Sequence, residues 1–218
     1  RPVLAIYSTF LLRAVDQIMQ DVCISSSPVI FAVDRAGIVG ADGETHQGQF
    51  DLSFLKMLPN LTIMSPCDAT ELKMMLDFAY DLQKPTVIRY PKDKAILSEL
   101  ENFHPDIASQ PFIHLLQGSQ VLIIVVGTFV SIAREAAKEL KERGISCGIL
   151  YLRVLKPLAK ESLLEVISNY QQVLVIEENV FSGSTASDIG CLLHDLDKTI
   201  GFSSINLPDR FIEHDSRT

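Results

Sequence analysis

Short apolar runs alternate with longer segments of helical period along both halves of the 218-residue chain. Runs typical of strands cover residues 3–7, 28–33, 61–64, 86–90, 112–116, 121–126, 146–151, 173–177 and 202–205. Between most of them, apolar residues recur at three- and four-residue spacing, which predicts helices over residues 9–25, 50–58, 65–81, 130–143, 160–170 and 185–195. Strands that alternate with helices are typical of mostly parallel sheets, so the pattern predicts an α/β architecture.

The stretch over residues 93–110 interrupts this alternation, because it mixes polar residues with proline and has no apolar period. We interpret it as a linker between a first domain over residues 1–92 and a second domain over residues 111–218. No sequence repeat relates the two halves. The expected fold class is therefore α/β, with two consecutive domains that each contain a mostly parallel sheet.

Charge and composition exclude several classes of protein. The chain has 27 acidic and 19 basic residues, and the resulting charge of −8 disfavours binding to nucleic acid or to an anionic membrane. The longest aliphatic run, Val121–Val126, is far shorter than the ~20 residues that cross a bilayer. Four cysteines and five histidines lack metal-ligand spacing, so we expect no metal site and reduced thiols, as in a cytoplasmic protein. The chain opens at Arg1 with neither an initial methionine nor a secretory leader, and we expect it to be a piece of a longer protein.

Polar and aromatic side chains follow three strands of the first half at the point where each strand ends. These residues are Tyr7, Arg35 and Lys92, to which a glycine-rich loop adds Asp42 and His46. Ligands of parallel α/β sheets bind at the carboxyl ends of the strands. The sequence therefore predicts a cleft with acid–base and anion-binding character at this edge.

Two residues of the first helix extend this prediction. Phe10 and Arg13 share a stripe that differs from the apolar face of the helix, and a ring beside a cation suits an aromatic, charged ligand. Taken singly, several candidates have simpler interpretations: Phe10 as a core residue, Arg35 as a surface ion pair and Asp42 as a turn residue. His46 alone fits a ligand contact or a plain loop position. The predicted cleft thus depends on their convergence.

The second half carries fewer signals. Residues 182–187, SGSTAS, precede a helix and fit either a serine N-cap or an anion site formed by free backbone amides. Gly127 is not followed by the later glycines of a dinucleotide-binding fingerprint, which disfavours a nicotinamide cofactor. Glu177, Glu178 and Asn179 stand at a strand end and fit an interface or a cleft rim.

Two longer segments carry a family resemblance. Residues 7–17 read YSTFLLRAVDQ, and residues 34–48 read DRAGIVGADGETHQG. Shorter matches lie at residues 65–68, 89–91, 155–158, 177–179 and 207–212. Together they resemble the 1-deoxy-D-xylulose-5-phosphate synthases, thiamine-diphosphate enzymes of the transketolase superfamily, along the whole chain. The resemblance implies most of a pyrimidine-binding domain, without its start, followed by nearly all of a transketolase C-terminal domain.

The resemblance implies an activity for the parent enzyme. Pyruvate and D-glyceraldehyde 3-phosphate condense to 1-deoxy-D-xylulose 5-phosphate with loss of carbon dioxide, and the product feeds isoprenoid, thiamine and pyridoxal synthesis. The implied cofactors are thiamine diphosphate and Mg²⁺, whose diphosphate and metal contacts belong to sequence outside this chain. The implied partners are the missing N-terminal domain and a second copy in a homodimer. We therefore expect a fragment without turnover of its own.

The resemblance also implies roles for the candidate residues. His46 and Asp42 match catalytic positions, His46 as an imidazole that exchanges protons and Asp42 as a ligand of acceptor hydroxyls or a helper in proton transfer. Tyr7 and Arg35 match substrate-contact positions.

The remaining matches concern the cofactor and the substrate phosphate. Phe10 matches the ring that packs on the aminopyrimidine of the cofactor, and Arg13 lies beside it. Where the family has Arg-Gly after Arg-Tyr-Pro, this chain has Lys92 and Asp93. Lysine offers a positive charge without the planar fork of arginine, and Asp93 adds an opposing charge. Lys92 is the candidate that binds the acceptor phosphate.

Two other interpretations stay open. A transketolase-like or pyruvate dehydrogenase beta-like subunit would work with a separate partner chain, although the glutamate that such subunits carry is expected just before Arg1. A non-catalytic interaction module would keep the fold without the chemistry. The intact set of candidate residues in the first half disfavours this second alternative.

Overall fold

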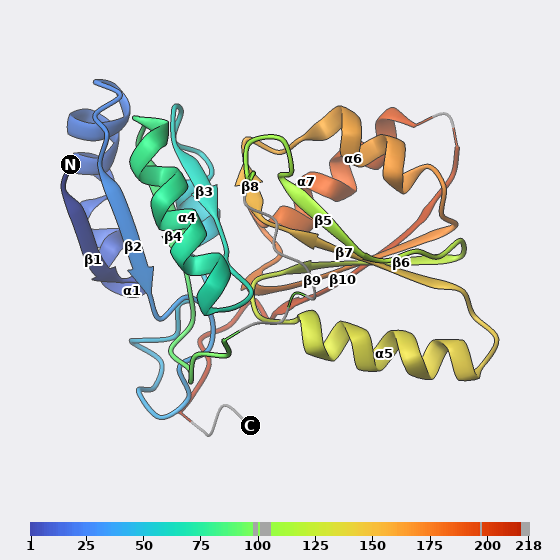
Figure 1. Cartoon of the computed structure of the whole chain (residues 1–218). Helices are drawn as coiled ribbons and strands as arrows, with labels where there is room; N and C mark the ends of the chain where they lie inside the picture. The colour runs from blue at the N-terminus through green and yellow to red at the C-terminus, as the bar shows by residue number, and fades with distance from the viewer. Residues whose placement is uncertain (98–99, 101–105, 197, 215–218) are drawn as a thin grey trace.

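The computed structural model describes residues 1–97, 100, 106–196 and 198–214, which form two five-stranded sheets beside each other (Figure 1). Each sheet has four parallel strands and one antiparallel strand at an edge. The prediction of two consecutive, mostly parallel α/β units is confirmed. The expected linker over residues 93–110 lies partly outside the described residues.

The first sheet has the strand order β1-β2-β4-β3-β8. Its strands are β1 (Val3–Tyr7), β2 (Ile30–Asp34), β3 (Thr62–Met64), β4 (Thr86–Arg89) and β8 (Val154–Lys156). Its helical segments are α1 (Ser8–Leu11), η1 (Leu12–Ala14), α2 (Val15–Gln17), η2 (Ile18–Cys23), α3 (Asp51–Leu55) and α4 (Ala69–Leu82). The single helix expected over residues 9–25 is divided into segments that differ in hydrogen-bond register, η1 being a 3-10 helix and η2 a π-helix. Between η1 and α2 the backbone also departs from helical geometry, since Ala14 has φ −109° and ψ 12°.

The second sheet has the strand order β10-β9-β6-β7-β5. Its strands are β5 (Phe112–Leu116), β6 (Val121–Val126), β7 (Cys147–Leu152), β9 (Gln172–Val180) and β10 (Gly201–Leu207). Its helices are α5 (Val130–Glu142), α6 (Lys160–Ile167), α7 (Thr185–Leu192) and the short η3 (Leu193–Asp195). Helix α5 covers one face of the sheet, and α6 and α7 cover the other (Figure 1).

The start of α4 differs from the sequence prediction, which began this helix at residue 65. The observed N-cap is Asp68, whose Oδ1 accepts a hydrogen bond of 2.7 Å from the backbone N–H of Glu71. The N–H of Ser65 donates to the carbonyl of Arg153 at 3.1 Å. An aspartate with a glutamate three residues later is itself a strong N-terminal signal, and here it competes successfully with the earlier serine.

Strand β8 belongs to the second half of the chain but pairs with the first sheet. It lies antiparallel to β3, with Met64 opposite Val154 and Ile63 opposite Lys156. A three-residue strand is too short to show an apolar period, so it was absent from the expected strands. The first sheet is therefore completed by sequence from beyond the expected linker.

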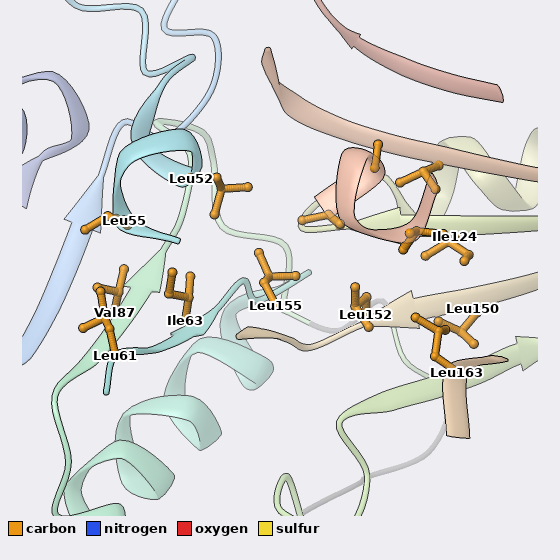
Figure 2. Close-up of a cluster of buried hydrophobic side chains, with 14 of the residues drawn as sticks. Leu52, Leu55, Leu61, Ile63, Val87, Ile124, Leu150, Leu152, Leu155 and Leu163 are labelled. Carbon is orange, nitrogen blue, oxygen red and sulfur yellow. The ribbon is translucent and has the colours of Figure 1, made fainter. Parts of the chain in front are cut away.

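One hydrophobic cluster is continuous across both sheets (Figure 2). The first unit contributes Leu52 and Leu55 from α3 together with residues of β3 and β4. The second unit contributes Leu152, Leu155 and Leu163, and Leu155 lies between the two groups. The apolar surface buried between the sheets makes the two units one packed body.

A buried ion pair also joins the units. Arg153, between β7 and β8, donates from Nε and Nη2 to the carboxylate of Glu71 on α4, at 2.8 and 2.9 Å, and both side chains are fully buried. The hydroxyl of Tyr151 donates to the carbonyl of Ser65 at 2.7 Å. Burial raises the pKa of Glu71, while the guanidinium of Arg153 opposes that rise.

Two further features bear on the class of protein. Within the described ranges, no helix is long and apolar enough to cross a membrane. All four cysteines are free thiols, as expected, and Cys23, Cys67 and Cys147 are buried. Burial raises the pKa of these three thiols above the ordinary value, so they stay protonated near neutral pH and are poor nucleophiles.

Candidate functional site

The carboxyl ends of β1, β2 and β4 lie side by side. In the parallel register of the sheet, Tyr7 is opposite Asp34 and Val33 is opposite Arg89. The residues that follow these positions therefore emerge at one edge, as the sequence predicts. The structure brings all seven candidate residues into connected contacts at this edge. They are Tyr7, Phe10, Arg13, Arg35, Asp42, His46 and Lys92.

A row of aromatic and cationic groups forms the first part of the site. The guanidinium carbon of Arg35 lies 3.6 Å from the ring centroid of Tyr7, and the Tyr7 and Phe10 rings stack with centroids 5.3 Å apart. His46 meets Phe10 edge-on at 5.4 Å, and the guanidinium carbon of Arg13 lies 5.3 Å from the centre of the same ring. Phe10 is only half-buried and has polar neighbours, so its interpretation as a core residue is wrong.

A charged group lies beside this row. The Nζ atom of Lys92 donates to Oδ2 of Asp42 at 2.7 Å, and Nε of Arg35 lies 3.7 Å from the same oxygen. The guanidinium of Arg35 also pairs with Asp34. The hydrogen bond from Lys92 and the charges of Arg35 and His46 hold the pKa of Asp42 below its ordinary value. Asp42 is therefore an anionic acceptor in the working pH range.

The loop that carries Asp42 and His46 is closed at its base. Gly37 and Gly48 exchange two backbone hydrogen bonds, with N···O distances of 2.8 and 2.7 Å. A Cβ atom at position 48 would lie 2.1 Å from the carbonyl oxygen of Arg35, so only glycine fits there. Within the loop, the buried side chain of Gln47 accepts from the N–H of Val39 at 2.8 Å. These contacts define one loop geometry at the edge of the sheet.

The side chain of His46 has a defined neighbour. Its Nδ1 atom lies 2.8 Å from the hydroxyl oxygen of Thr45, the residue before it. A hydroxyl that donates to Nδ1 favours the tautomer with the proton on Nε2. The ring can therefore present Nε2 as the nitrogen that exchanges protons.

The second unit contacts the loop through β9 and through the C-terminal segment. Oε1 of Glu178, on β9, accepts from the N–H of Ile38 at 3.2 Å. In the C-terminal segment, the carbonyl of Glu213 accepts a hydrogen bond from the side-chain amide of Gln47 at 3.4 Å. The carbonyl of Arg210 accepts one from the side-chain amide of Gln49 at 2.9 Å. The sequence predicts an interface or a cleft rim at residues 177–179, which the contact of Glu178 fits, whereas residues 207–212 have no signal beyond their match to the resemblance.

A hollow of about 390 Å³ lies where the loop meets the C-terminal segment. Its lining comes from the loop and from that segment. The lining residues are Asp42, Gly43, Glu44, Thr45, Glu213 and His214. Since Asp42 belongs to both the hollow and the charged group, the hollow extends the site along the loop.

One arginine at this edge is not available to a ligand. Arg89 donates from Nε and Nη2 to the carboxylate of Asp51 at 2.8 and 3.1 Å, and from Nη2 to the carbonyl of Glu178 at 3.1 Å. Its side chain is 4% exposed and that of Asp51 is fully buried. Arg89 is therefore held by contacts within the chain, whereas Arg13, Arg35 and Lys92 contact other members of the cluster.

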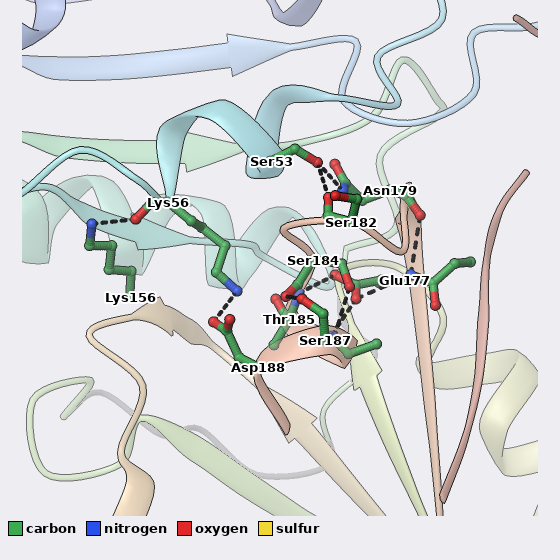
Figure 3. Close-up of polar contacts among 12 residues, drawn as sticks. Ser53, Lys56, Lys156, Glu177, Asn179, Ser182, Ser184, Thr185, Ser187 and Asp188 are labelled. Atoms are coloured by element: carbon green, nitrogen blue, oxygen red, sulfur yellow. Dashed lines mark hydrogen bonds and ion pairs between the residues drawn. The ribbon is translucent and has the colours of Figure 1, made fainter. Parts of the chain in front are cut away.

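The serine-rich segment before α7 does not form an anion site. Ser184 is the N-cap, and its side chain accepts from the N–H of Ser187 at 3.0 Å. The backbone amides of Thr185 and Ala186 donate to the carboxylate of Glu177 at 3.2 and 2.6 Å (Figure 3). A carboxylate of the chain itself thus occupies the amides that an external anion would need, so the N-cap interpretation is correct.

The cluster at the sheet edge has the chemistry of a site for an aromatic cofactor and an anionic substrate. The half-buried Phe10 ring, with Tyr7, His46 and Arg13 around it, fits a heterocycle. Over the residues with described placement, no group of three or more histidine, cysteine or acidic side chains is arranged to hold a metal ion.

Two family models match the chain. “Transketolase, pyrimidine binding domain” matches residues 1–96, and “Transketolase, C-terminal domain” matches residues 113–218.

The curated relatives described next share the same protein name. The chain is 44% identical over 214 residues to the “1-deoxy-D-xylulose-5-phosphate synthase” of Caldanaerobacter subterraneus subsp. tengcongensis, which covers 98% of this chain and 34% of that protein. It is 45% identical over 221 residues to the protein of the same name from Natranaerobius thermophilus, covering 100% of this chain and 35% of that protein. The chain thus spans about a third of the length of these relatives.

Solved structures share the fold. “Split gene transketolase, inactive beta4 tetramer” superposes with a TM-score of 0.83 and 27% identity, over 95% of this chain and 66% of that chain. A transketolase mutant from Pichia Stipitis superposes with a TM-score of 0.79 and 21% identity, over 98% of this chain and 30% of that chain.

Proposed function

The chain belongs to the transketolase family, as a pyrimidine-binding domain followed by a C-terminal domain, and we propose that it is part of a 1-deoxy-D-xylulose-5-phosphate synthase. The reaction is the condensation of pyruvate with D-glyceraldehyde 3-phosphate to 1-deoxy-D-xylulose 5-phosphate, with release of carbon dioxide. The observation that carries this proposal is the connected cluster of seven side chains at the sheet edge, in a chain 44% identical to synthases of that name.

The residues of the cluster fit the ring end of thiamine diphosphate. Phe10 is half-buried, and the guanidinium carbon of Arg13 lies 5.3 Å from the centre of its ring. When bound, the cofactor supplies the carbanion equivalent that allows pyruvate to lose carbon dioxide. We assign the diphosphate and Mg²⁺ contacts to an N-terminal domain of the same enzyme.

The other side chains have roles on the substrates. Tyr7 and Arg35 stack at 3.6 Å and bind the substrates through a phenol and a guanidinium. Lys92 binds the phosphate of glyceraldehyde 3-phosphate. Asp42 accepts hydrogen bonds from substrate hydroxyls because its carboxylate stays ionised.

His46 moves protons at the hydroxyl oxygens formed as the carbon–carbon bond is made. Thr45 engages Nδ1 at 2.8 Å, which leaves Nε2 for proton exchange with the substrate. An imidazole suits this role because its ordinary pKa lies near neutral pH. The aromatic edge contact with Phe10, at 5.4 Å, keeps the ring beside the proposed cofactor face.

A chimeric enzyme tests the proposal. In it, this chain replaces the matching third of the Caldanaerobacter relative. Carbon dioxide released from labelled pyruvate is measured with and without glyceraldehyde 3-phosphate, and the product is identified by mass spectrometry. We expect release that depends on the aldehyde, and its loss in the His46→Ala chimera. A folded chimera that binds thiamine diphosphate but forms no deoxyxylulose phosphate would contradict the proposal.

A second candidate is ketol transfer of the transketolase type. The observation in its favour is the 0.83 TM-score and 27% identity to a split-gene transketolase, a chain whose length this one covers to 66%. The two reactions differ in the donor, since ketol transfer uses a ketose phosphate and releases no carbon dioxide. Xylulose 5-phosphate as donor in the same chimera therefore separates them.

The proposed partners are the N-terminal domain and a second copy of the chain. Large apolar side chains are exposed on and near β1, including Val3 at 57%, Leu4 at 44% and Leu12 at 53%, which favours association. We expect a species larger than the 24.2 kDa monomer in light scattering at micromolar concentration. The free thiols agree with a cytoplasmic location for the enzyme.

A further inference from the structure

The loop that carries Asp42 and His46 depends on contacts from outside it. It runs from the end of β2 to α3 without forming a helix or strand of its own. Its base is the pair of hydrogen bonds between Gly37 and Gly48. Whatever fixes this base therefore fixes the position of both proposed catalytic side chains.

Glu178 contacts the base from the other sheet. Its Oε1 atom accepts from the N–H of Ile38 at 3.2 Å. A Cβ atom at position 37 would lie 2.5 Å from its Oε2 and 2.7 Å from its Cβ, so the loop backbone packs directly on the Glu178 side chain. Gly37 has φ +82°, in the region that favours glycine, so glycine suits both this backbone conformation and the close packing on Glu178.

The backbone of Glu178 is itself tied to the first sheet. Its carbonyl accepts from Nη2 of Arg89 at 3.1 Å, and Arg89 is held by the buried carboxylate of Asp51. One residue of β9 thus contacts both the strand end that carries Arg89 and the loop that carries His46. The Glu178 side chain can therefore set the distance between this strand end and the loop.

We propose that Glu178 is a positioning residue, through which the second domain fixes the base of the His46 loop. The proposal deepens the proposed function and rests on it for the role of His46. A carboxylate is suited to the task because it accepts a charge-assisted hydrogen bond from a backbone amide. A displacement of a reacting group by about 1 Å costs on the order of 10²-fold in rate, so a small shift of the base suffices to affect turnover.

Amide hydrogen exchange of the 218-residue chain tests the proposal without any assay of the reaction. We expect Glu178→Ala to speed exchange over residues 37–48 by about 10-fold or more, with exchange in β4 and β6 unchanged. Glu178→Gln keeps an oxygen that accepts from Ile38, so it should restore most of the protection. The matched control is Asp188→Asn, which removes the ion pair between Asp188 and Lys56, another contact between the two units (Figure 3).

Several outcomes would overturn the proposal. These are unchanged loop exchange in Glu178→Ala, equal acceleration throughout both sheets, or the same loop effect in Asp188→Asn. Should Glu178→Ala fail to fold, Gly37→Ala places a Cβ against the intact Glu178 side chain and must produce the same local acceleration. Turnover of the chimera is scored separately, so an inactive chimera with the expected exchange pattern contradicts the proposed function and leaves the role of Glu178 supported.

Discussion

The Nζ atom of Lys92 lies 2.7 Å from Oδ2 of Asp42, so two side chains with separate proposed roles are joined in one ion pair. Lys92 stands after β4, and Asp42 lies 50 residues earlier in the loop after β2. An ammonium group has three N–H donors, so under the proposed function Lys92 binds the substrate phosphate while it also donates to Asp42.

The first prediction concerns substrate binding by Lys92. In the chimera, Lys92→Ala should raise the KM for glyceraldehyde 3-phosphate by about 10-fold, since one charged hydrogen bond is lost. The kcat value and the KM for pyruvate should stay nearly unchanged, because a phosphate contact stabilises ground and transition states alike. Lys92→Arg should keep or lower the aldehyde KM. If Lys92→Ala leaves that KM unchanged, Arg35 becomes the candidate, since Arg89 is 4% exposed and bound to Asp51.

The second prediction concerns the ionisation of Asp42. The hydrogen bond from Lys92 is the largest cause that lowers its pKa, so Lys92→Ala should move this pKa up toward the ordinary value of about 3.9. Because the pKa is lowered, the ion pair persists above the ordinary value and is lost only as the pH falls through the lowered one. Carboxyl NMR titration of both proteins measures the change.

Asp106 provides the internal control for that titration. Its pKa is lowered chiefly by hydrogen bonds from Ser109, and Lys92 is not among the causes. The Asp106 titration should therefore be the same in both proteins. A shift of both carboxyls, or of neither, would count against the ion pair as the cause.

The third prediction separates chemistry from binding at His46. In the chimera, His46→Ala should lower kcat by roughly 10²- to 10⁴-fold, the usual contribution of a positioned acid or base. The aldehyde KM should change little, because Lys92 and Arg35 remain. His114→Ala on β5 is the control, since this exposed histidine lies outside the cluster and should leave kcat unchanged. A normal kcat in His46→Ala would show that another group moves the proton.

The elements and the site edge were predictable from sequence because their signals are local. The strand over Val3–Tyr7 begins and ends where the sequence predicts. Tyr7, Arg35 and Lys92 each follow a strand, and the carboxyl ends of parallel strands meet at one edge of the sheet, so these three residues were expected to lie near one another. Phe10 and Arg13 are three residues apart, so helical spacing predicts them on one stripe. In the structure the guanidinium carbon of Arg13 lies 5.3 Å from the centre of the Phe10 ring. Local patterns therefore recovered the candidate residues.

Contacts between distant segments left no comparable signal. Strand β8 has three residues and joins a sheet formed by the other half of the chain. The sequence indicates an interface or a cleft rim at Glu178 and nothing at Arg153, and it names neither partner, because Ile38 and Glu71 lie 140 and 82 residues away. Charge alone does not identify a partner at such separation. Ser65 does not cap α4 for a related reason, because its hydroxyl donates to the carbonyl of Arg89, 24 residues away, at 3.4 Å.

The fourth prediction concerns the cofactor. Isothermal titration of the 218-residue chain with thiamine diphosphate and Mg²⁺ should show no binding tighter than about 1 μM, near −8 kcal/mol. The described residues offer Phe10 and Arg13 for the ring but no cluster for a metal ion. The chimera, which adds the N-terminal part of the relative, is the comparison and should bind more tightly. Submicromolar binding by the chain alone would contradict the assignment of the diphosphate contacts to another domain.

The last prediction concerns the stability of the joint between the two units. Glu71→Leu should lower the free energy of unfolding by about 3–5 kcal/mol, because it leaves the fully buried guanidinium of Arg153 without its carboxylate. The double variant Glu71→Leu/Arg153→Met removes both charges and should regain most of that loss, since apolar pairs of similar volume replace buried ion pairs at little cost. Urea denaturation of the wild type, both single variants and the double variant gives the coupling energy. Lys73→Met, which removes an exposed ion pair on the same helix, is the control and should change stability by less than about 1 kcal/mol. Additive losses in the double variant would contradict direct coupling between Glu71 and Arg153.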